Sequence, residues 1–385
     1  MPPNADSNGG AGPGVLQRGT SFMKKMWGRQ MSMPITPGTP HDLSVVDMVV
    51  LNTPEINEKE TSAAKLKRLV QQLRRRDPVS PAMGSASFVH HGEDAMATGS
   101  FYHIVADGIS NSAKVADLLG SLSPSAILAR SLVHAVEQMI LHADLPTHVS
   151  EFEAMVKHAI RNAQLQCRGV APEMGSTLLV AYVARKSLFT FCMGDSKALV
   201  VRKGRIVYET LSVVKEFNVP SIVTHHPVRP QMFVVQSAPL RRGDLILSFS
   251  DGFGDNVYKD DLLRTLAAAQ ASDTSLSAVC LTLLHLAQTY TPALGSDDNA
   301  SLPFSAAAAM EYVARAQGPD CSDEDVRRAR QLSKRFDGRA KQLLARQLTV
   351  QGSKRHYSLA QLYNMANLQK KKPDDISIAL LEFRG

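Results

Sequence analysis

The sequence has 385 residues, of which 44% are hydrophobic and 21% are charged, and its formal net charge is +7. This composition is ordinary for a globular domain, and no apolar run is long enough to span a bilayer, so we expect no transmembrane segment. The four cysteines are widely spaced and form no C-x-x-C pair. That spacing argues against both a disulfide framework and a thiolate zinc site.

The first 42 residues form a basic tail that is rich in Gly, Pro, Ser and Met. Such a segment has too little apolar surface to build a core, so we expect it to be disordered. Within it, residues 15–31 carry basic and apolar side chains and no acids, a pattern that resembles a mitochondrial presequence. We therefore expect a cytoplasmic protein, with mitochondrial import as the alternative.

Residues 43–82 are predicted to hold a strand at 43–51 and a basic amphipathic helix at 58–76, which ends at Asp77-Pro78. The basic run raises the question of a nucleic-acid ligand. Zinc-finger spacing and aromatic-studded basic strands are absent from the sequence, so we interpret the run as a solvated helix face and expect no specific nucleic-acid binding.

Residues 83–385 are predicted to form one domain. Strands are expected at about 85–91, 101–106, 176–184, 187–193, 197–203, 244–250 and 376–383. Helices are expected at about 123–143 and 148–167 and over most of 260–366. Strands separated by paired helices, without regular βαβ units, favour an α+β fold. We expect a helical insertion at about 291–366, before the last strand, that includes an exposed basic helix at 327–346.

Aspartates stand where several predicted strands begin or end, at Asp107, Asp195, Asp251 and Asp374. In an antiparallel sheet the end of one strand lies beside the start of its neighbour, so these acids are expected to converge on one rim. Crowded carboxylates raise one another's pKa values, which a divalent cation relieves. Oxygen ligands favour Mg²⁺ or Mn²⁺ over zinc. Asn at Asp107 or Asp251 is therefore expected to preserve or raise metal-free stability.

Six segments, taken in order, resemble the metal-dependent protein phosphatase family of type 2C over residues 84–385. They are Gly92-Glu93-Asp94-Ala95, Ala106-Asp107-Gly108, Gly175-Ser176-Thr177-Leu178, Gly194-Asp195-Ser196, Ser250-Asp251-Gly252-Phe253-Gly254-Asp255-Asn256 and Lys372-Pro373-Asp374-Asp375-Ile376-Ser377. The first and last are most similar to the branch that includes mitochondrial phosphatases. The resemblance implies an antiparallel β-sandwich flanked by helices on both faces, in αββα layers.

The resemblance also implies a centre that holds two Mg²⁺ or Mn²⁺ ions, with the metal-binding residues Glu93, Asp94, Asp107, Gly108, Asp195, Asp251 and Asp374. Asp107 would bridge both ions, the Gly108 carbonyl would bind one, and Asp251 and Asp374 would complete the pair. Glu93 and Asp94 would hold metal-bound waters, and Asp195 a third, looser ion. The expected nucleophile is a metal-bridging water, so no side chain is assigned as catalytic.

The implied function is a protein serine/threonine phosphatase, a monomer that hydrolyses phosphoserine and phosphothreonine in phosphoproteins. Ile109 stands where many members carry a histidine that protonates the leaving group, and Val89 replaces a phosphate-binding arginine. The neighbouring His90 and His91 are candidates for phosphate binding or proton transfer, or are simply exposed. Because residues 109–111 also lose the family's glycines, the alternative is a pseudophosphatase that acts as a binding module.

Cys321 and Arg327 have the Cys-x5-Arg spacing of cysteine-dependent phosphatases. The five residues between them include three carboxylates and no glycine. Such a loop would repel phosphate and raise the pKa of the thiol, so we reject a cysteine nucleophile.

Overall fold

The computed structural model describes residues 83–109, 122–169, 174–272, 274–289, 302–318, 321–344, 347–349, 356–368 and 371–385. All of these residues belong to one compact unit, Asp47–Gly385. The predicted tail at 1–42, strand at 43–51 and helix at 58–76 lie outside the described residues.

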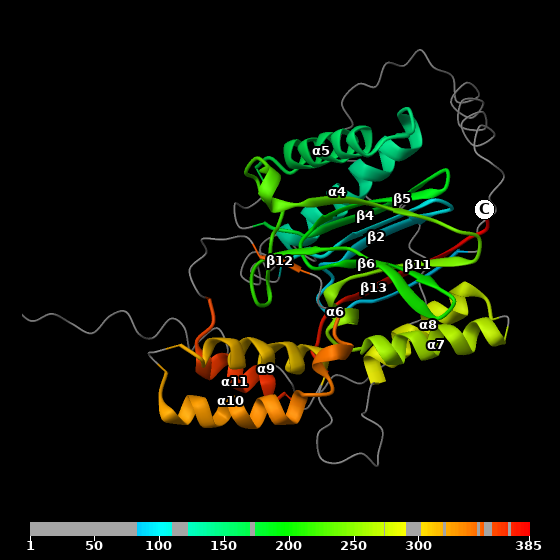
Figure 1. Ribbon diagram of the computed structural model, residues 1–385. Coiled ribbons are helices and arrows are strands. Elements are labelled where there is room, and N and C mark those ends of the chain that lie inside the picture. The colour runs from blue at the N-terminus through cyan, green and yellow to red at the C-terminus, as the bar shows by residue number, and fades with distance from the viewer. Residues whose placement is uncertain are drawn as a thin grey trace, which may run out of the picture. The chain divides into compact units, whose positions relative to one another are not determined.

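Two five-stranded sheets form the centre of this unit (Figure 1). The first sheet has the order β1 (Met83–Phe88), β13 (Ile376–Phe383), β11 (Asp244–Phe249), β6 (Lys197–Arg202) and β7 (Arg205–Glu209). The second has the order β10 (Val234–Pro239), β5 (Ser187–Met193), β4 (Leu178–Ala184), β3 (Tyr102–Ala106) and β2 (Ala95–Gly99). Neighbouring strands pair antiparallel throughout both sheets.

The sheets pack face to face because their strands are apolar on both faces. In β4, Leu179 and Ala181 belong to the core between the sheets, where they meet Val200 and Ile246 of the first sheet. The alternate residues of β4, such as Val180, belong to the core on the opposite face. Since successive side chains of a strand point to opposite faces, one continuous apolar run supplies two cores.

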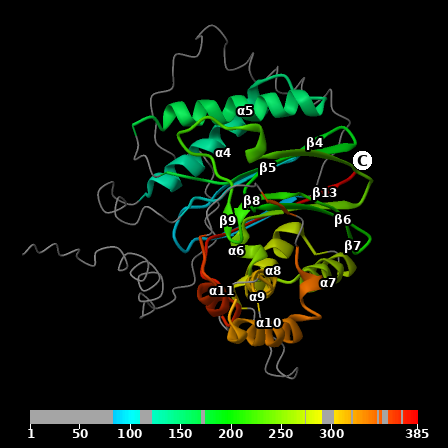
Figure 2. The ribbon, with the colours of Figure 1, turned by 60° about the vertical axis from the view of Figure 1, so that its left-hand side comes forward.

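Helices cover the outer face of each sheet (Figure 2). The second sheet is covered by α4 (Pro124–His142) and α5 (Val149–Gln166). The first is covered by α7 (Lys259–Ala271) and α8 (Leu276–Thr289), with the one-turn helix α6 (Asp251–Gly254) directly after β11. This αββα arrangement confirms the predicted fold class.

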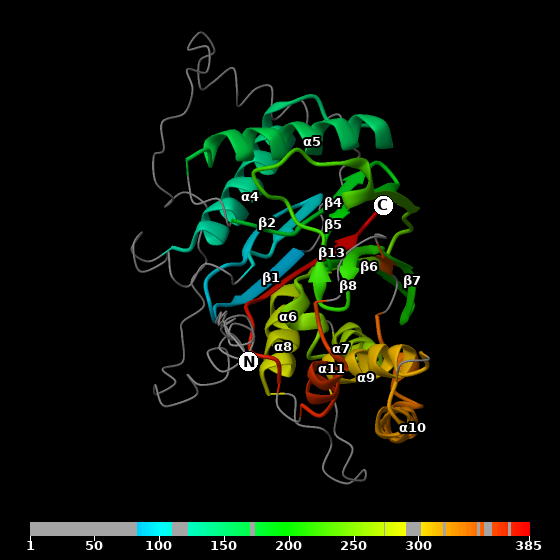
Figure 3. The same cartoon turned by 90° about the vertical axis from the view of Figure 1, so that its left-hand side faces the viewer.

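A third group of helices packs around its own apolar core (Figure 3). It comprises α9 (Pro303–Arg315), α10 (Asp323–Phe336) and α11 (Leu359–Ala366). The prediction of a continuous helix over 327–346 is wrong beyond Phe336, because α10 ends there and the one-turn 3₁₀ helix Ala340–Gln342 follows. The strand β12 (Gln347–Thr349) then pairs with β8 (Ser212–Glu216), which also pairs with β9 (Val219–Pro220).

The sequence prediction also missed short elements, among them β2, β7, β8, β9, β10 and the 3₁₀ turn Pro230–Met232. β2 has the sequence AMATG, which lacks the β-branched and aromatic richness of a typical strand. Within the described parts of the chain, the helices are too short or too polar for any of them to cross a membrane.

Candidate metal centre

The predicted acids lie at strand ends that the pairing brings to one rim of each sheet. Asp107 follows β3, whose Val105 pairs with Leu179 near the start of β4. Asp251 follows β11, whose Phe249 pairs with Ile378 near the start of β13, the strand that Asp374 precedes. The convergence therefore follows from antiparallel register.

The acids of the two sheets lie close enough to repel one another. Burial, the largest cause, raises the pKa of Asp107 well above its usual value, and further increases come from Asp251, Asp94, Asp374 and Asp195. Burial and Asp251 likewise raise the pKa of Asp195 to about 8. The pKa of Asp374 rises to about 7 for the same two reasons. The acids form one cluster of mutually repelling carboxylates.

Lys372 extends its ammonium group into this cluster. Its Nζ lies 2.7 Å from Asp251 Oδ2, 2.7 Å from Asp255 Oδ2 and 3.2 Å from Asp374 Oδ2. Burial raises the pKa of Asp251, but hydrogen bonding and attraction to Lys372 outweigh it, so this pKa lies below its usual value. One cation thus partly neutralises the cluster.

Asp375 holds the loop that carries Glu93 and Asp94. The carboxylate of Asp375 is 3% exposed and accepts hydrogen bonds from five consecutive backbone N–H groups, those of His90, His91, Gly92, Glu93 and Asp94. Burial raises the pKa of Asp375, but these donors outweigh it and lower the pKa below its usual value. The loop is therefore pinned to the start of β13.

Side-chain contacts orient Glu93 and Asp94. Ser123, the N-cap residue of α4, donates to Glu93 Oε1 at 2.8 Å, and Ser377 donates to Asp94 Oδ2 at 2.8 Å. Gly108 donates its N–H to Glu93 O at 3.2 Å, and a Cβ at Gly108 would lie 2.8 Å from that oxygen. Only glycine allows this close approach of the two backbones.

Three carboxylate oxygens of the described residues are buried without a hydrogen-bond partner: Asp94 Oδ1, Asp195 Oδ1 and Asp251 Oδ1. Leaving buried oxygens unpaired is costly, and oxygen donors suit Mg²⁺ or Mn²⁺, so this donor set fits the expected ions. In the described ranges, however, no three His, Cys, Asp or Glu side chains are arranged to enclose an ion. The seven predicted ligands remain a prediction, one that requires rearrangement around Lys372.

The departures from the family pattern lie beside the cluster. Ile109 packs against Gly175, where a Cβ would lie 2.6 Å from Ile109 Cδ1. Val89 is 67% exposed, and the adjacent His90 and His91 are also exposed, with ring centroids 4.3 Å apart. Residues 110 and 111, which lack the family's glycines, lie outside the described residues.

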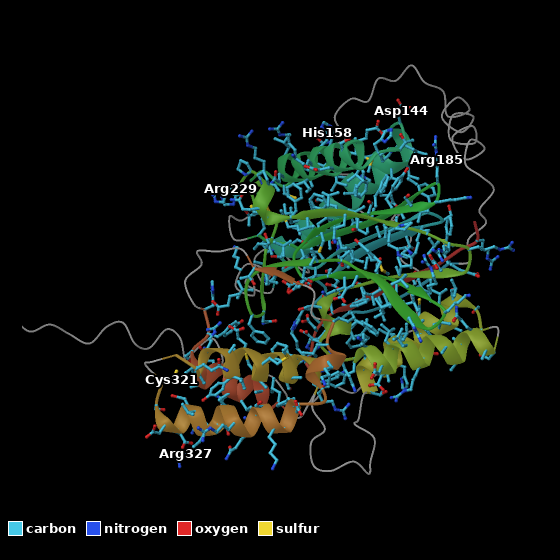
Figure 4. All side chains as sticks on the ribbon, in the orientation of Figure 1. Asp144, His158, Arg185, Arg229, Cys321 and Arg327 are labelled. Atoms are coloured by element: carbon cyan, nitrogen blue, oxygen red, sulfur yellow. The ribbon has the colours of Figure 1, made fainter. Side chains whose placement is uncertain are left out.

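Cys321 and Arg327 do not form a phosphate-binding loop. Cys321 lies just before α10 and Arg327 lies in its first turns (Figure 4); Cys321 donates to Arg315 O at 3.4 Å, and Arg327 pairs with Glu324 at 2.6 Å. These contacts occupy the two groups that a cysteine-dependent phosphatase would use on its substrate.

Sequence reasoning did not single out Lys372, Asp375, Asp255 and Ser123, which contact the predicted ligands or hold the loop that carries them. Three of them lie inside motifs that were already assigned, next to or near a predicted ligand. The available signal for these three was a charged side chain within a motif that already held a predicted ligand. Ser123 had a weaker signal, as the N-cap residue of a predicted helix.

The comparisons with known proteins agree with this architecture. The sequence profile described as “Protein phosphatase 2C” matches residues 84–283, just over half of the chain. The solved structure titled “X-ray structure of the photosystem II phosphatase PBCP” superposes with a TM-score of 0.51 and 19% identity, covering 79% of this chain and 98% of that one. At this identity the superposition shows the shared fold alone.

Curated relatives match over shorter stretches. “Protein phosphatase PTC7 homolog fig” of Drosophila erecta is 36% identical over 107 residues, which cover 25% of this chain and 34% of the relative. “Probable protein phosphatase 2C 71” of Oryza sativa subsp. japonica is 26% identical over 237 residues, 60% of this chain and 48% of the relative. The chain thus spans about a third to a half of these relatives. On the profile match, the protein belongs to the protein phosphatase 2C family.

Proposed function

We propose that this protein is a protein serine/threonine phosphatase that uses Mg²⁺ or Mn²⁺ to hydrolyse phosphomonoesters in phosphoproteins. The observation that carries the proposal is the set of three buried, unpartnered carboxylate oxygens on one rim of a 2C-family fold. In a cluster of acids with a purely structural role, hydrogen-bond donors would pair with such oxygens. Unpaired buried oxygens instead favour a site that accepts cations.

The proposed ligands are Asp107, Asp251 and Asp374, with Asp195 at a looser position and the Gly108 carbonyl beside Asp107. Two divalent ions held there would supply a water of lowered pKa and positive charge for the phosphoryl oxygens. Asp375 pins the loop, and Ser123 and Ser377 orient its acids, so we expect Glu93 and Asp94 to hold metal-bound waters by accepting hydrogen bonds from them. Because these contacts already hold Glu93 and Asp94 in place, substrate binding need not order them.

Substrate contacts are proposed for the exposed rim of the same loop. The His90 and His91 side chains project from the segment that Asp375 fixes, and both rings are exposed. Burial, the largest cause, and the neighbouring His91 lower the pKa of His90. A neutral imidazole can donate one hydrogen bond to a phosphoryl oxygen, which suits the place where the family arginine is replaced by Val89.

The decisive experiment is hydrolysis of a phosphothreonine peptide by the full chain in Mn²⁺, in Mg²⁺ and in excess chelator. We expect turnover with either metal and none with chelator. Turnover that survives chelation would contradict metal dependence. Protein that binds Mn²⁺ yet hydrolyses neither phosphothreonine nor phosphoserine peptides would instead be the pseudophosphatase. A monomeric state and a cytoplasmic or mitochondrial location belong to the same proposal and need sedimentation and fractionation measurements.

A further inference from the structure

The ammonium of Lys372 lies where the cluster needs positive charge. Its side chain is 17% exposed, and its Nζ contacts Asp251 and Asp374, two of the proposed metal ligands, together with Asp255. A lysine amine is protonated at neutral pH, and three carboxylate oxygens within 3.2 Å of this one favour its charged form. The group is therefore a cation that already neutralises part of the site.

Hydrogen bonds to Asn256 fix the backbone of Lys372, so any movement of the residue falls to its side chain. Asn256 donates through Nδ2 to Lys372 O at 3.0 Å and to Gly252 O at 2.7 Å, and its Oδ1 accepts from Lys372 N at 2.8 Å. This clamp ties the residue to α6, so the four-carbon stem is the part that can swing. Lys372 Nζ also lies 5.4 Å from the centroid of the Phe304 ring in α9.

An ammonium and a divalent ion that bind the same carboxylates repel each other. A Mg²⁺ or Mn²⁺ ion requires oxygens at about 2.1 Å in near-octahedral geometry. The Lys372 proton donors already lie 2.7 Å from Asp251 Oδ2, and like charges a few ångströms apart repel strongly in a buried site. An ion that engages Asp251 and Asp374, even through the unpartnered Asp251 Oδ1, must therefore overcome the repulsion of the ammonium on Oδ2.

We propose that Lys372 is an internal counter-ion that holds the acid cluster together in the metal-free protein and that divalent metal must displace from Asp251 and Asp374. Lys372 thereby weakens metal affinity and raises the metal concentration at which the site fills. This inference rests on the metal binding in the proposed function, but not on catalysis.

The first test compares Lys372→Gln with wild type and with Lys371→Gln. Lys371 carries the same charge one residue away, but its Nζ lies 5.6 Å from the centroid of the Phe88 ring and has no carboxylate contact in the described structure, so its variant controls for long-range charge. We expect Lys372→Gln to lower the Mn²⁺ dissociation constant, measured by calorimetry, on the order of tenfold. Lys371→Gln should stay within about twofold of wild type.

The melting temperature in chelator supplies a second readout from the same variants. Without its ammonium, the Lys372→Gln cluster contains unpaired carboxylates, so it should melt below wild type in chelator and recover in saturating Mn²⁺. An Mn²⁺ dissociation constant equal to or higher than that of wild type would overturn the proposal.

A measurement on the wild-type chain covers the case in which Lys372→Gln does not fold. Acetylation of lysine amines, followed by mass spectrometry, reports how accessible each amine is. We expect Lys372 to react several-fold faster in Mn²⁺ than in chelator, with Lys371 as the internal reference. Equal or slower labelling of Lys372 in Mn²⁺ would refute displacement.

The outcomes separate this inference from the proposed function. Protein that binds Mn²⁺ with the expected Lys372 effects but hydrolyses nothing would retain the counter-ion and lose the phosphatase assignment. Suppose instead that the protein is active, that Lys372→Gln leaves its Mn²⁺ affinity unchanged, and that metal leaves the labelling of Lys372 unchanged. The phosphatase assignment would then stand and the counter-ion proposal would fail. If neither wild type nor Lys372→Gln binds Mn²⁺, the counter-ion proposal fails.

Discussion

Asp375 accepts a hydrogen bond from the backbone N–H of Glu93 at 2.6 Å, although the two residues are 282 positions apart in the chain. The same carboxylate accepts from four more N–H groups of this loop. A single buried charge therefore fixes the geometry of both Glu93 and Asp94.

The first prediction is that Asp375→Asn destabilises the fold and weakens the metal site together. The amide keeps the size of the side chain but turns an NH₂ group toward backbone donors and removes the charge. We expect a loss of about 2–3 kcal/mol in the free energy of unfolding, measured in urea, and weaker Mn²⁺ binding. Glu382→Gln in β13, the strand that follows Asp375, is the control, since its side chain is 32% exposed. Unchanged stability in Asp375→Asn would contradict the role assigned to this carboxylate.

The second prediction contrasts Asp107→Asn with Asp251→Asn. Sequence reasoning expected both to preserve or raise metal-free stability, but Asp251 is paired with Lys372 at 2.7 Å. The pKa of Asp107 is raised by burial and by Asp251, so removing its charge relieves repulsion, whereas removing that of Asp251 breaks a buried ion pair.

Melting temperatures in chelator should therefore move apart: Asp107→Asn stays at or above wild type, and Asp251→Asn falls below it. In Mn²⁺ both variants should lose turnover of a phosphothreonine peptide and lose Mn²⁺ affinity in calorimetry. Wild-type turnover in either variant would remove that residue from the ligand set.

The third prediction concerns pH and Glu216. This 8% exposed side chain joins β8 to the helices: it accepts from Arg315 at 3.1 Å and from the backbone N–H groups of His356 at 2.7 Å and Tyr357 at 3.1 Å. Burial raises the pKa of Glu216, but these donors outweigh it and lower the pKa below its usual value.

A carboxyl whose pKa is lowered by folding stabilises the native state above its unfolded pKa, about 4.3, and loses that contribution as pH falls through its folded pKa. Glu216→Gln should thus cost about 2 kcal/mol at pH 7, and the difference from wild type should shrink below about pH 4. Urea denaturation at both pH values measures this. Glu153→Gln, at an exposed pair with Lys157, should show little change at either. A difference for Glu216→Gln that is constant with pH would exclude the assigned ionic role.

The fourth prediction is that Cys321→Ser retains wild-type phosphatase turnover. The thiol donates to Arg315 O at the end of α9, and the serine hydroxyl can keep that hydrogen bond. Turnover should remain sensitive to chelator in both proteins. Vanadate-sensitive, chelator-resistant activity that disappears in Cys321→Ser would reverse the assignment of the nucleophile.

The sequence was informative where local pattern and tertiary role coincide. β4, β5 and β11 are apolar runs bounded by turn residues, and their fully or nearly fully buried positions explain why they could be predicted. Asp107 and Asp251 stood out because each follows such a run and precedes a glycine. A strand that is buried on both faces appears in the sequence as a continuous apolar run, which can be recognised without knowing its neighbouring strands.

The sequence was less informative where a residue's role depends on distant partners. β8 and β9 gave no recognisable periodicity, because these strands are only five and two residues long. In the sequence Asp375 resembles an ordinary turn aspartate, because the loop that donates hydrogen bonds to it lies 281–285 positions away. Lys372 likewise reads as an exposed charge, since its three carboxylate partners come from two separate motifs.

The position of β13 has a consequence for how the protein is made. This strand lies between β1 and β11, and the segment just before it supplies Lys372, Asp374 and Asp375. On the ribosome β1 and β11 emerge before the strand that separates them, so the first sheet cannot close until residues 376–383 have left the exit tunnel. Until then the hydrogen-bonding edges of β1 and β11 lack their shared neighbour, and a nascent chain that pauses before residue 370 has neither a complete core nor the complete cluster of acids.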